Sequence, residues 1–124
     1  MLIGCPKEIK PQEFRVGLTP NAVKEVILNG HTVLIETGAG AGSGFSDQLY
    51  KDAGAKIVKS AKEIFSQAEM IVKVKEPQRI ERKMLKESQL LFTYLHLAPD
   101  LDQTQDLLKS NCTAIAYETV TDDH

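Results

Sequence analysis

The chain has 124 residues, the size of one domain with room for a hydrophobic core, and its formal net charge of −2 offers no basic surface to a nucleic acid. No stretch has the length and apolarity of a membrane span or the form of a signal peptide. Cys5 and Cys112 are too far apart, with no ligand-spaced partners, for a metal site or disulfide framework, so we expect a cytoplasmic protein with reduced thiols and no bound metal.

Apolar runs alternate with helical patterns along the whole chain. The short apolar runs that predict strands are residues 2–5, 32–36, 56–58, 70–74, 90–95 and 113–117. The residues that predict helix starts are Thr19 before Pro20, Ser46, Ser60 with Glu63, and Asp100 with Gln103. Residues 78–88 indicate a weak amphipathic helix or a turn. Strands and helices in alternation predict an α/β fold, a Rossmann-like parallel sheet with helices on both faces.

A run of alternate glycines, residues 38–44, lies between a predicted strand and a predicted helix. The dinucleotide fingerprint is G-x-G-x-x-G. Whichever glycine of this run is taken as the first, the position of the third glycine holds another residue. Backbone amides at a helix start could still hold an anion. We nevertheless interpret the run as a tight, closely packed turn, because glycine permits both unusual backbone angles and close approach.

Three basic side chains fall at the carboxyl ends of predicted strands: Arg15 in the loop after residues 2–5, Lys75, and His96. In a parallel sheet these ends share one edge, where ligands bind in open α/β folds. A guanidinium can grip a carboxylate with two hydrogen bonds, and an imidazole can transfer protons near neutral pH. Together they predict a pocket for an α-keto or α-amino acid, with Tyr94 as a neighbouring partner. Taken singly, Arg15 and Lys75 could be solvated charges and His96 a strand cap.

Several motifs in order resemble the N-terminal region of alanine dehydrogenases and of the nicotinamide nucleotide transhydrogenase α-chain. They are Gly4-x-Pro6-x-Glu8, Glu13-x-Arg15-Val16, Thr19-Pro20, Glu36 to Asp47 with its glycines, Ile71 to Pro77, and Phe92 to Ala98. The resemblance covers essentially the whole chain, and one mild departure is Gln12, where an Asn is common. Within this family, alanine dehydrogenases have a lysine and a histidine at the positions of Lys75 and His96, whereas the transhydrogenase branch lacks both. The chain therefore resembles the alanine dehydrogenases.

The resemblance implies a flavodoxin-like catalytic domain that takes part in the NAD-dependent conversion of L-alanine and water to pyruvate and ammonia. Arg15 and Lys75 would hold the carboxylate and carbonyl region of the substrate, and His96 would be the catalytic proton donor and acceptor. The family implies a homo-hexamer. It also implies that residues 1–124 are the N-terminal part of the substrate-binding domain, whereas NAD is bound by a further domain.

On that basis we expect residues 1–124 alone to bind NAD poorly, to be inactive, and to expose apolar surface. Two other functions remain open from the sequence. One is a stand-alone, non-catalytic module that binds a keto acid, and the other is part of a transhydrogenase α-chain.

Overall fold

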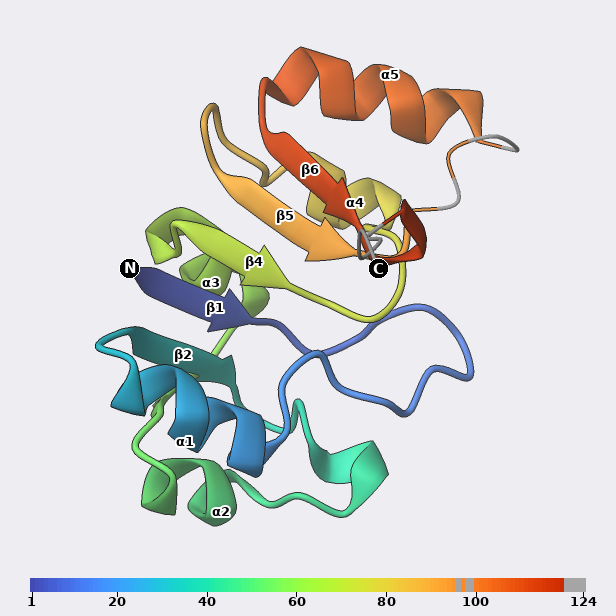
Figure 1. Cartoon of the computed structure of the whole chain (residues 1–124). Coiled ribbons are helices and arrows are strands. Elements are labelled where there is room, and N and C mark those ends of the chain that lie inside the picture. Colours follow the sequence, from blue (N-terminus) through green and yellow to red (C-terminus); the bar gives the residue numbers. More distant parts are fainter. Residues whose placement is uncertain (96, 98–99, 120–124) are drawn as a thin grey trace, which may run out of the picture.

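The computed structural model describes residues 1–95, 97 and 100–119. The strands are β1 (Leu2–Cys5), β2 (Thr32–Glu36), β3 (Lys56–Val58), β4 (Met70–Val72), β5 (Leu90–Thr93) and β6 (Thr113–Ala116). The α-helices are α1 (Pro20–Leu28), α2 (Asp47–Asp52), α3 (Ala61–Gln67), α4 (Arg79–Arg82) and α5 (Leu101–Ser110), and the 3-10 turns are η1 (Ala41–Ser43) and η2 (Tyr117–Thr119). These elements confirm the predicted alternation (Figure 1).

All the described strand pairs are parallel, and the order across the sheet is β3-β2-β1-β4-β5-β6. The direction of the chain across the sheet therefore reverses between β1 and β4, where Ile3 is the partner of Met70. This is the Rossmann strand order, which confirms the predicted fold class. Without the short edge strand β3, the remaining order β2-β1-β4-β5-β6 is the flavodoxin order 2-1-3-4-5, so the observed sheet also agrees with the flavodoxin-like form that the resemblance implied.

The helix starts follow the sequence signals. The side chain of Thr19 accepts a hydrogen bond from the amide of Ala22, and Pro20 occupies the first helical position of α1. Ser46, Ser60 and Asp100 accept comparable bonds at the starts of α2, α3 and α5. The ambiguous region 78–88 contains only the single helical turn α4.

Two strands, β4 and β5, end two residues earlier than their apolar runs predict, because side chains replace the sheet as hydrogen-bond partners. The amides of Val74 and Lys75 donate to the carboxylate of Glu8, so β4 stops at Val72. Beyond β5, the amide of Leu95 donates to a carboxylate oxygen of Glu118. Both early ends lie at the carboxyl edge of the sheet.

The core has one cluster on each face of the sheet. One cluster joins β1 and β2 to α1 and α2 through residues such as Val23, Val33 and Tyr50. The other joins the opposite face to α3 and α5 through residues such as Phe65 and Leu107. Helices therefore lie on both faces, as predicted.

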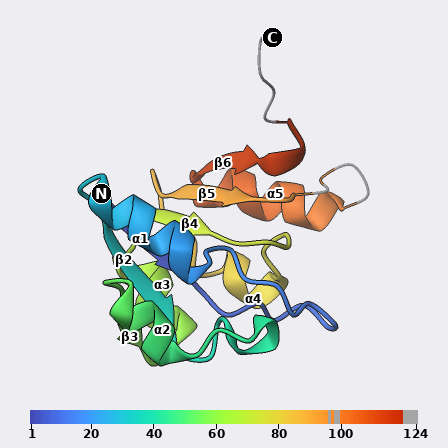
Figure 2. The same cartoon turned by 60° about the horizontal axis from the view of Figure 1, so that its bottom comes forward.

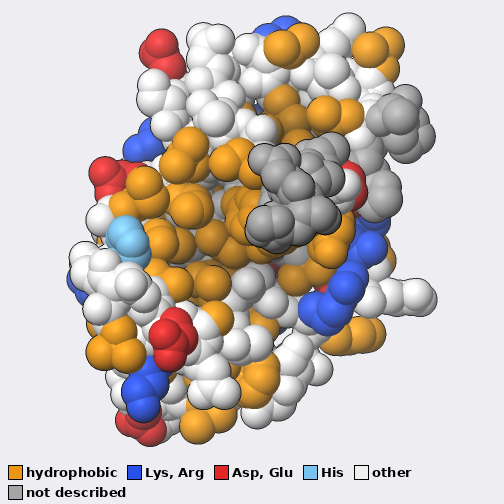
Figure 3. Space-filling model, in the orientation of Figure 1, with side chains coloured by type: hydrophobic (Ala, Val, Ile, Leu, Met, Phe, Trp, Pro, Cys, Tyr) orange, Lys and Arg blue, Asp and Glu red, His pale blue; other side chains and the backbone are white. Residues whose placement is uncertain are grey.

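The helical cover is uneven, because on the α1 side no described helix lies over β5 and β6 (Figures 1 and 2). Apolar side chains gather on this open face in Figure 3, and Tyr94 and Ile115 are 40% and 42% exposed. The structure thus has the exposed apolar surface that was expected. Among the described residues, no helix has both the length and the apolar character needed to cross a bilayer.

Candidate active site

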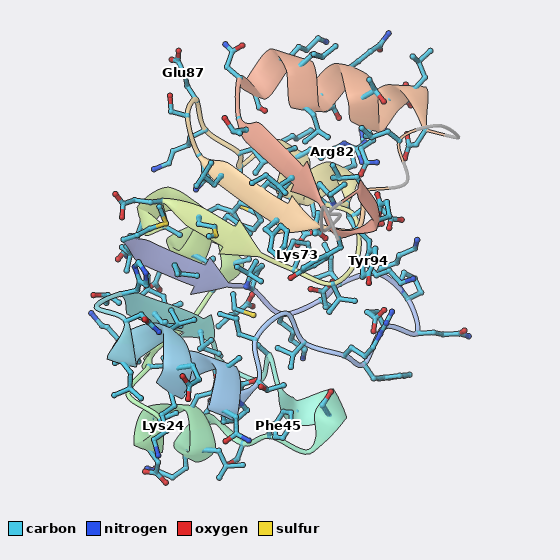
Figure 4. All side chains as sticks on the ribbon, in the orientation of Figure 1. Lys24, Phe45, Lys73, Arg82, Glu87 and Tyr94 are labelled. Atoms are coloured by element: carbon cyan, nitrogen blue, oxygen red, sulfur yellow. The ribbon has the colours of Figure 1, made fainter. Side chains whose placement is uncertain are left out.

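Two of the three predicted site residues come from the segments that follow β1 and β4, the strands at which the sheet reverses direction. Arg15 lies in the loop that connects β1 to α1, and Lys75 follows β4 by three residues. Figure 4 shows Lys73 and Tyr94 close to the same carboxyl edge. Open α/β sheets bind ligands outside such a reversal point, so the position itself is that of a binding site.

Arg15 is held by a neighbour in its own loop. Its Nε donates to Glu13 Oε2 over 3.0 Å and its Nη2 donates to Glu13 Oε1 over 2.8 Å. This two-point pairing lowers the pKa of Glu13 to about 2 and raises the pKa of Arg15. The pairing with Glu13 fixes the orientation of the guanidinium. Because the Arg15 side chain is 63% exposed, the part of the guanidinium that does not contact Glu13 is accessible to a ligand.

Arg15 and Lys75 line the same cavity, which has a volume of about 450 Å³. A water molecule occupies about 30 Å³ of liquid, so a three-carbon acid fits with ample space. The complete lining is Lys10, Pro11, Gln12, Glu13, Phe14, Arg15 and Lys75. His96, the third predicted site residue, lies outside the described residues. Tyr94 packs against Tyr117, with 4.9 Å between the ring centroids.

The glycine run forms the wall of an adjoining cavity of about 250 Å³, which Arg15 also lines. A Cβ on Gly42 would lie 2.8 Å from the carbonyl oxygen of Phe14, and one on Gly40 would lie 2.6 Å from the ring of Tyr50. Glycine is therefore required for close packing at these two positions. This geometry confirms the interpretation of the run as a tight turn, and it places the turn directly behind the Arg15 loop.

The polar groups of the glycine turn are already paired with a carboxylate. The amide of Gly38 donates to Asp47 Oδ1 over 2.9 Å, and the Thr37 hydroxyl donates to Asp47 Oδ2 over 2.5 Å. A negative charge in this position repels a phosphate. The loop after β1 offers no substitute, since α1 begins only at Pro20, which has no amide hydrogen, and the Ala22 amide is capped by Thr19. The described residues therefore do not fit a dinucleotide site.

A buried group of charges, missed from the sequence, lies beneath the site. Lys73 Nζ lies 3.1 Å from Glu8 Oε1 and 3.1 Å from Glu81 Oε2, and each of the three side chains is 1–2% exposed. Burial raises the pKa of Glu81. The signal available in the sequence was a lysine inside the apolar run Ile71 to Val74, because a buried ammonium needs carboxylate partners.

Comparison with known proteins is consistent with this geometry. Residues 4–124 match the family described as alanine dehydrogenase/PNT, N-terminal domain. An alanine dehydrogenase from Methanococcus maripaludis is 57% identical over 97% of this chain, which spans 32% of that relative. A solved L-alanine dehydrogenase superposes with a TM-score of 0.96 at 56% identity, covering 99% of this chain and 34% of that structure.

A transhydrogenase structure from Sinorhizobium meliloti is more distant. It superposes with a TM-score of 0.89 at 26% identity, and the match covers 95% of this chain and 34% of that one. The chain thus spans about a third of the length of the relatives that it matches. Because the family match extends over nearly every residue, the chain belongs to the alanine dehydrogenase/PNT N-terminal domain family and is homologous to alanine dehydrogenases.

Proposed function

We propose that residues 1–124 supply the N-terminal, substrate-binding part of an NAD-dependent alanine dehydrogenase. The reaction is L-alanine + NAD⁺ + water to pyruvate + ammonium + NADH + H⁺, and it runs in both directions. The single observation that carries the proposal is that Arg15 and Lys75 line one cavity at the reversal point of the sheet. The high identity to alanine dehydrogenases supports the choice of reaction.

In this proposal each of the three site residues has a role that its chemistry suits. The Arg15 guanidinium binds the substrate carboxylate with parallel hydrogen bonds, while its other edge remains paired with Glu13. The Lys75 ammonium faces the carbonyl oxygen of pyruvate and stabilises negative charge there. His96 donates and accepts the proton as water adds to, or leaves, the imine carbon. The protein thus places the substrate and handles its protons.

We propose that a domain outside residues 1–124 binds NAD, which when bound there would take up the hydride from the Cα of alanine. The poor fit of the described residues to a dinucleotide supports this division. The proposal includes a homo-hexamer, by family resemblance. It also places the enzyme in the cytoplasm, where Cys5 and Cys112, both free thiols, stay reduced.

The test is alanine-dependent NADH formation by the full-length gene product. Arg15→Ala should lower kcat/KM for alanine by a factor of about 100 or more, because the carboxylate loses its bidentate partner. His96→Ala should lower kcat by orders of magnitude while NAD affinity is nearly unchanged. Arg79→Ala removes an exposed arginine on α4 and serves as the matched control. Wild-type protein that reduces no NAD with alanine would contradict the proposal.

A keto-acid-binding module is the second candidate, and the poor fit to a dinucleotide is the observation that favours it. This function predicts saturable pyruvate binding by residues 1–124, which calorimetry would detect and Arg15→Ala would abolish. Alanine-dependent turnover by the full-length gene product would reject a purely non-catalytic role. The transhydrogenase function has less support, since the identity to that structure is 26% against 56% for the dehydrogenase.

A further inference from the structure

The backbone of Lys75 is held at both of its hydrogen-bonding groups by buried side chains. Its amide donates to Glu8 Oε1 over 3.0 Å, and its carbonyl accepts from the Thr93 hydroxyl over 2.8 Å. Residue 75 lies beyond the end of β4, where the last backbone bond between the two neighbouring segments runs from the Tyr94 amide to the Val74 carbonyl over 3.1 Å. The amide and carbonyl of Lys75 itself are held by Glu8 and Thr93. The side chain of Glu8 is 2% exposed and Thr93 is completely buried. Neither residue lines the cavity that Lys75 and Arg15 share, although Glu8 lines the adjoining cavity beside the glycine run.

Glu8 is rigid because three donors share its carboxylate. Besides the Lys75 amide, it accepts from the Val74 amide and from Lys73 Nζ, each over 3.1 Å. Lys73 also pairs with Glu81, which lies in α4, the helical turn after β4. Buried charges are stable only when their partners are correctly placed, so this arrangement fixes the Glu8 carboxylate relative to the segment that carries Lys75.

Thr93 occupies a position at which packing alone favours an apolar residue. It lies two residues after Leu91 on β5 and therefore on the same face of the strand. Leu91 is also completely buried and belongs to the core cluster that packs against α3 and α5. A buried hydroxyl needs a hydrogen-bond acceptor to offset the loss of water. The nearest acceptors are the carbonyls of Lys75 at 2.8 Å and Val74 at 3.1 Å, with the Tyr94 carbonyl farther away at 3.4 Å.

We propose that Glu8 and Thr93 are positioning residues for Lys75. They fix the peptide groups on either side of its Cα and thereby determine where the ammonium enters the cavity. This inference rests on the proposed function, in which Lys75 binds the carbonyl region of a 2-oxo acid. A displacement of about 1 Å in such a group can lower a rate by a factor of about 100, so a small loss of backbone control has a measurable effect.

The test is a pair of substitutions at Thr93, made in the full-length enzyme and assayed by the reductive amination of pyruvate. Thr93→Val keeps the shape and removes the hydroxyl, whereas Thr93→Ser keeps the hydroxyl and removes a methyl group. Positioning predicts that Thr93→Val lowers kcat/KM for pyruvate by about tenfold and that Thr93→Ser stays within about threefold of wild type. The KM for NADH should be unchanged in both variants.

A role for Thr93 in packing alone predicts the reverse order. Valine retains the buried volume and serine leaves a void, so Thr93→Ser would then be the more impaired and the less stable variant. That order, or wild-type kinetics in Thr93→Val, would overturn the inference. Glu8→Gln should act in the same direction as Thr93→Val if it folds, because one amide oxygen cannot replace a carboxylate shared by three donors.

Lys75→Met separates this inference from the function on which it rests. If Lys75→Met leaves pyruvate turnover unchanged, the proposed role of Lys75 is wrong and there is nothing to position. If it abolishes turnover while Thr93→Val behaves as wild type, only the positioning inference fails. In a Lys75→Met background, Thr93→Val should cause no further loss of pyruvate affinity, as measured by calorimetry. Lys24→Met, at an exposed lysine of α1, is the matched control for Lys75→Met.

Discussion

The ion pair of Arg15 and Glu13 sets the orientation of the guanidinium that we propose as the partner of the substrate's carboxylate. The carboxylate of Glu13 takes two guanidinium donors and also accepts from the Arg15 backbone amide over 2.8 Å. The orientation of the arginine is therefore already fixed by Glu13, although its side chain is largely exposed. A rigid, planar donor reduces the entropy lost when a carboxylate binds.

Arg15→Lys tests whether this planar geometry matters, since it retains the charge. A lysine cannot pair with Glu13 and a substrate carboxylate through two parallel bonds each, so the KM for pyruvate should rise by about tenfold or more. Steady-state kinetics of the full-length enzyme would measure it. The control is Arg79→Lys, which should leave KM unaltered because Arg79 is exposed on α4. An unaltered KM in Arg15→Lys would mean that only charge is required.

Among the elements, the glycine turn supports the loop between β1 and α1 that carries Arg15. Besides the close approach of Gly42 to Phe14, the Ser43 hydroxyl donates to the Phe14 carbonyl over 2.8 Å. On the other side, the buried Tyr50 hydroxyl donates to the carbonyl of Leu18 over 2.7 Å, joining α2 to the end of the same loop. The loop that carries Arg15 is thus fixed at two points by the segment after β2.

Gly42→Ala should displace this loop, because its Cβ would lie 2.8 Å and 3.1 Å from backbone atoms of Phe14. We expect a several-fold rise in the KM for pyruvate, since the adjacent Arg15 moves with the backbone. The comparison is Gly30→Ala, where φ is +91° and the nearest space is open. That substitution should cost about 1 kcal/mol of stability by backbone strain and leave KM unchanged. Equal kinetic effects of both substitutions would argue against a supporting role for the turn.

Prediction from the sequence succeeded where the causes are local and failed where they are distant. The caps at Thr19 and Ser60 and the alternation of strands depend on neighbouring residues, so the fold class followed from them. The ends of β4 and β5 did not follow, since their amides are taken by Glu8 and Glu118, which come from remote segments.

The candidate site divides in the same way. Strand ends that meet at one sheet edge predicted that Arg15 and Lys75 would be close together, and both line one cavity. The pairing of Arg15 with Glu13 and the buried contacts of Lys73 depend on side-chain geometry, which residue spacing does not specify. His96 lies outside the described residues, so its role stays a prediction.

For the molecule as a whole, ionised carboxylates couple stability to pH. Hydrogen bonds with Arg15, Thr37 and Arg82 respectively lower the pKa values of three acids, Glu13, Asp47 and Asp106, with Glu13 at about 2. A carboxyl whose pKa is lower in the folded state binds fewer protons there than in the unfolded chain. Its contribution to stability is therefore complete above the unfolded pKa and is lost as the pH falls towards the folded value.

The free energy of unfolding of the chain should accordingly decrease as the pH falls from about 4.5 towards 2. In Glu13→Gln this decrease should be shallower, because the substitution removes a group whose pKa changes from 4.5 to about 2 on folding. Urea unfolding at several pH values would measure both slopes. Identical slopes in the two proteins would show that the pair with Arg15 does not contribute to folding.

The most direct test of the account is a crystal structure of the full-length enzyme with pyruvate bound. We predict that the pyruvate carboxylate lies within hydrogen-bond distance of the Arg15 guanidinium and that its carbonyl oxygen faces the ammonium of Lys75, in the cavity at the ends of β1 and β4. Pyruvate bound elsewhere, with Arg15 and Lys75 contacting only solvent or protein, would contradict the proposed substrate site.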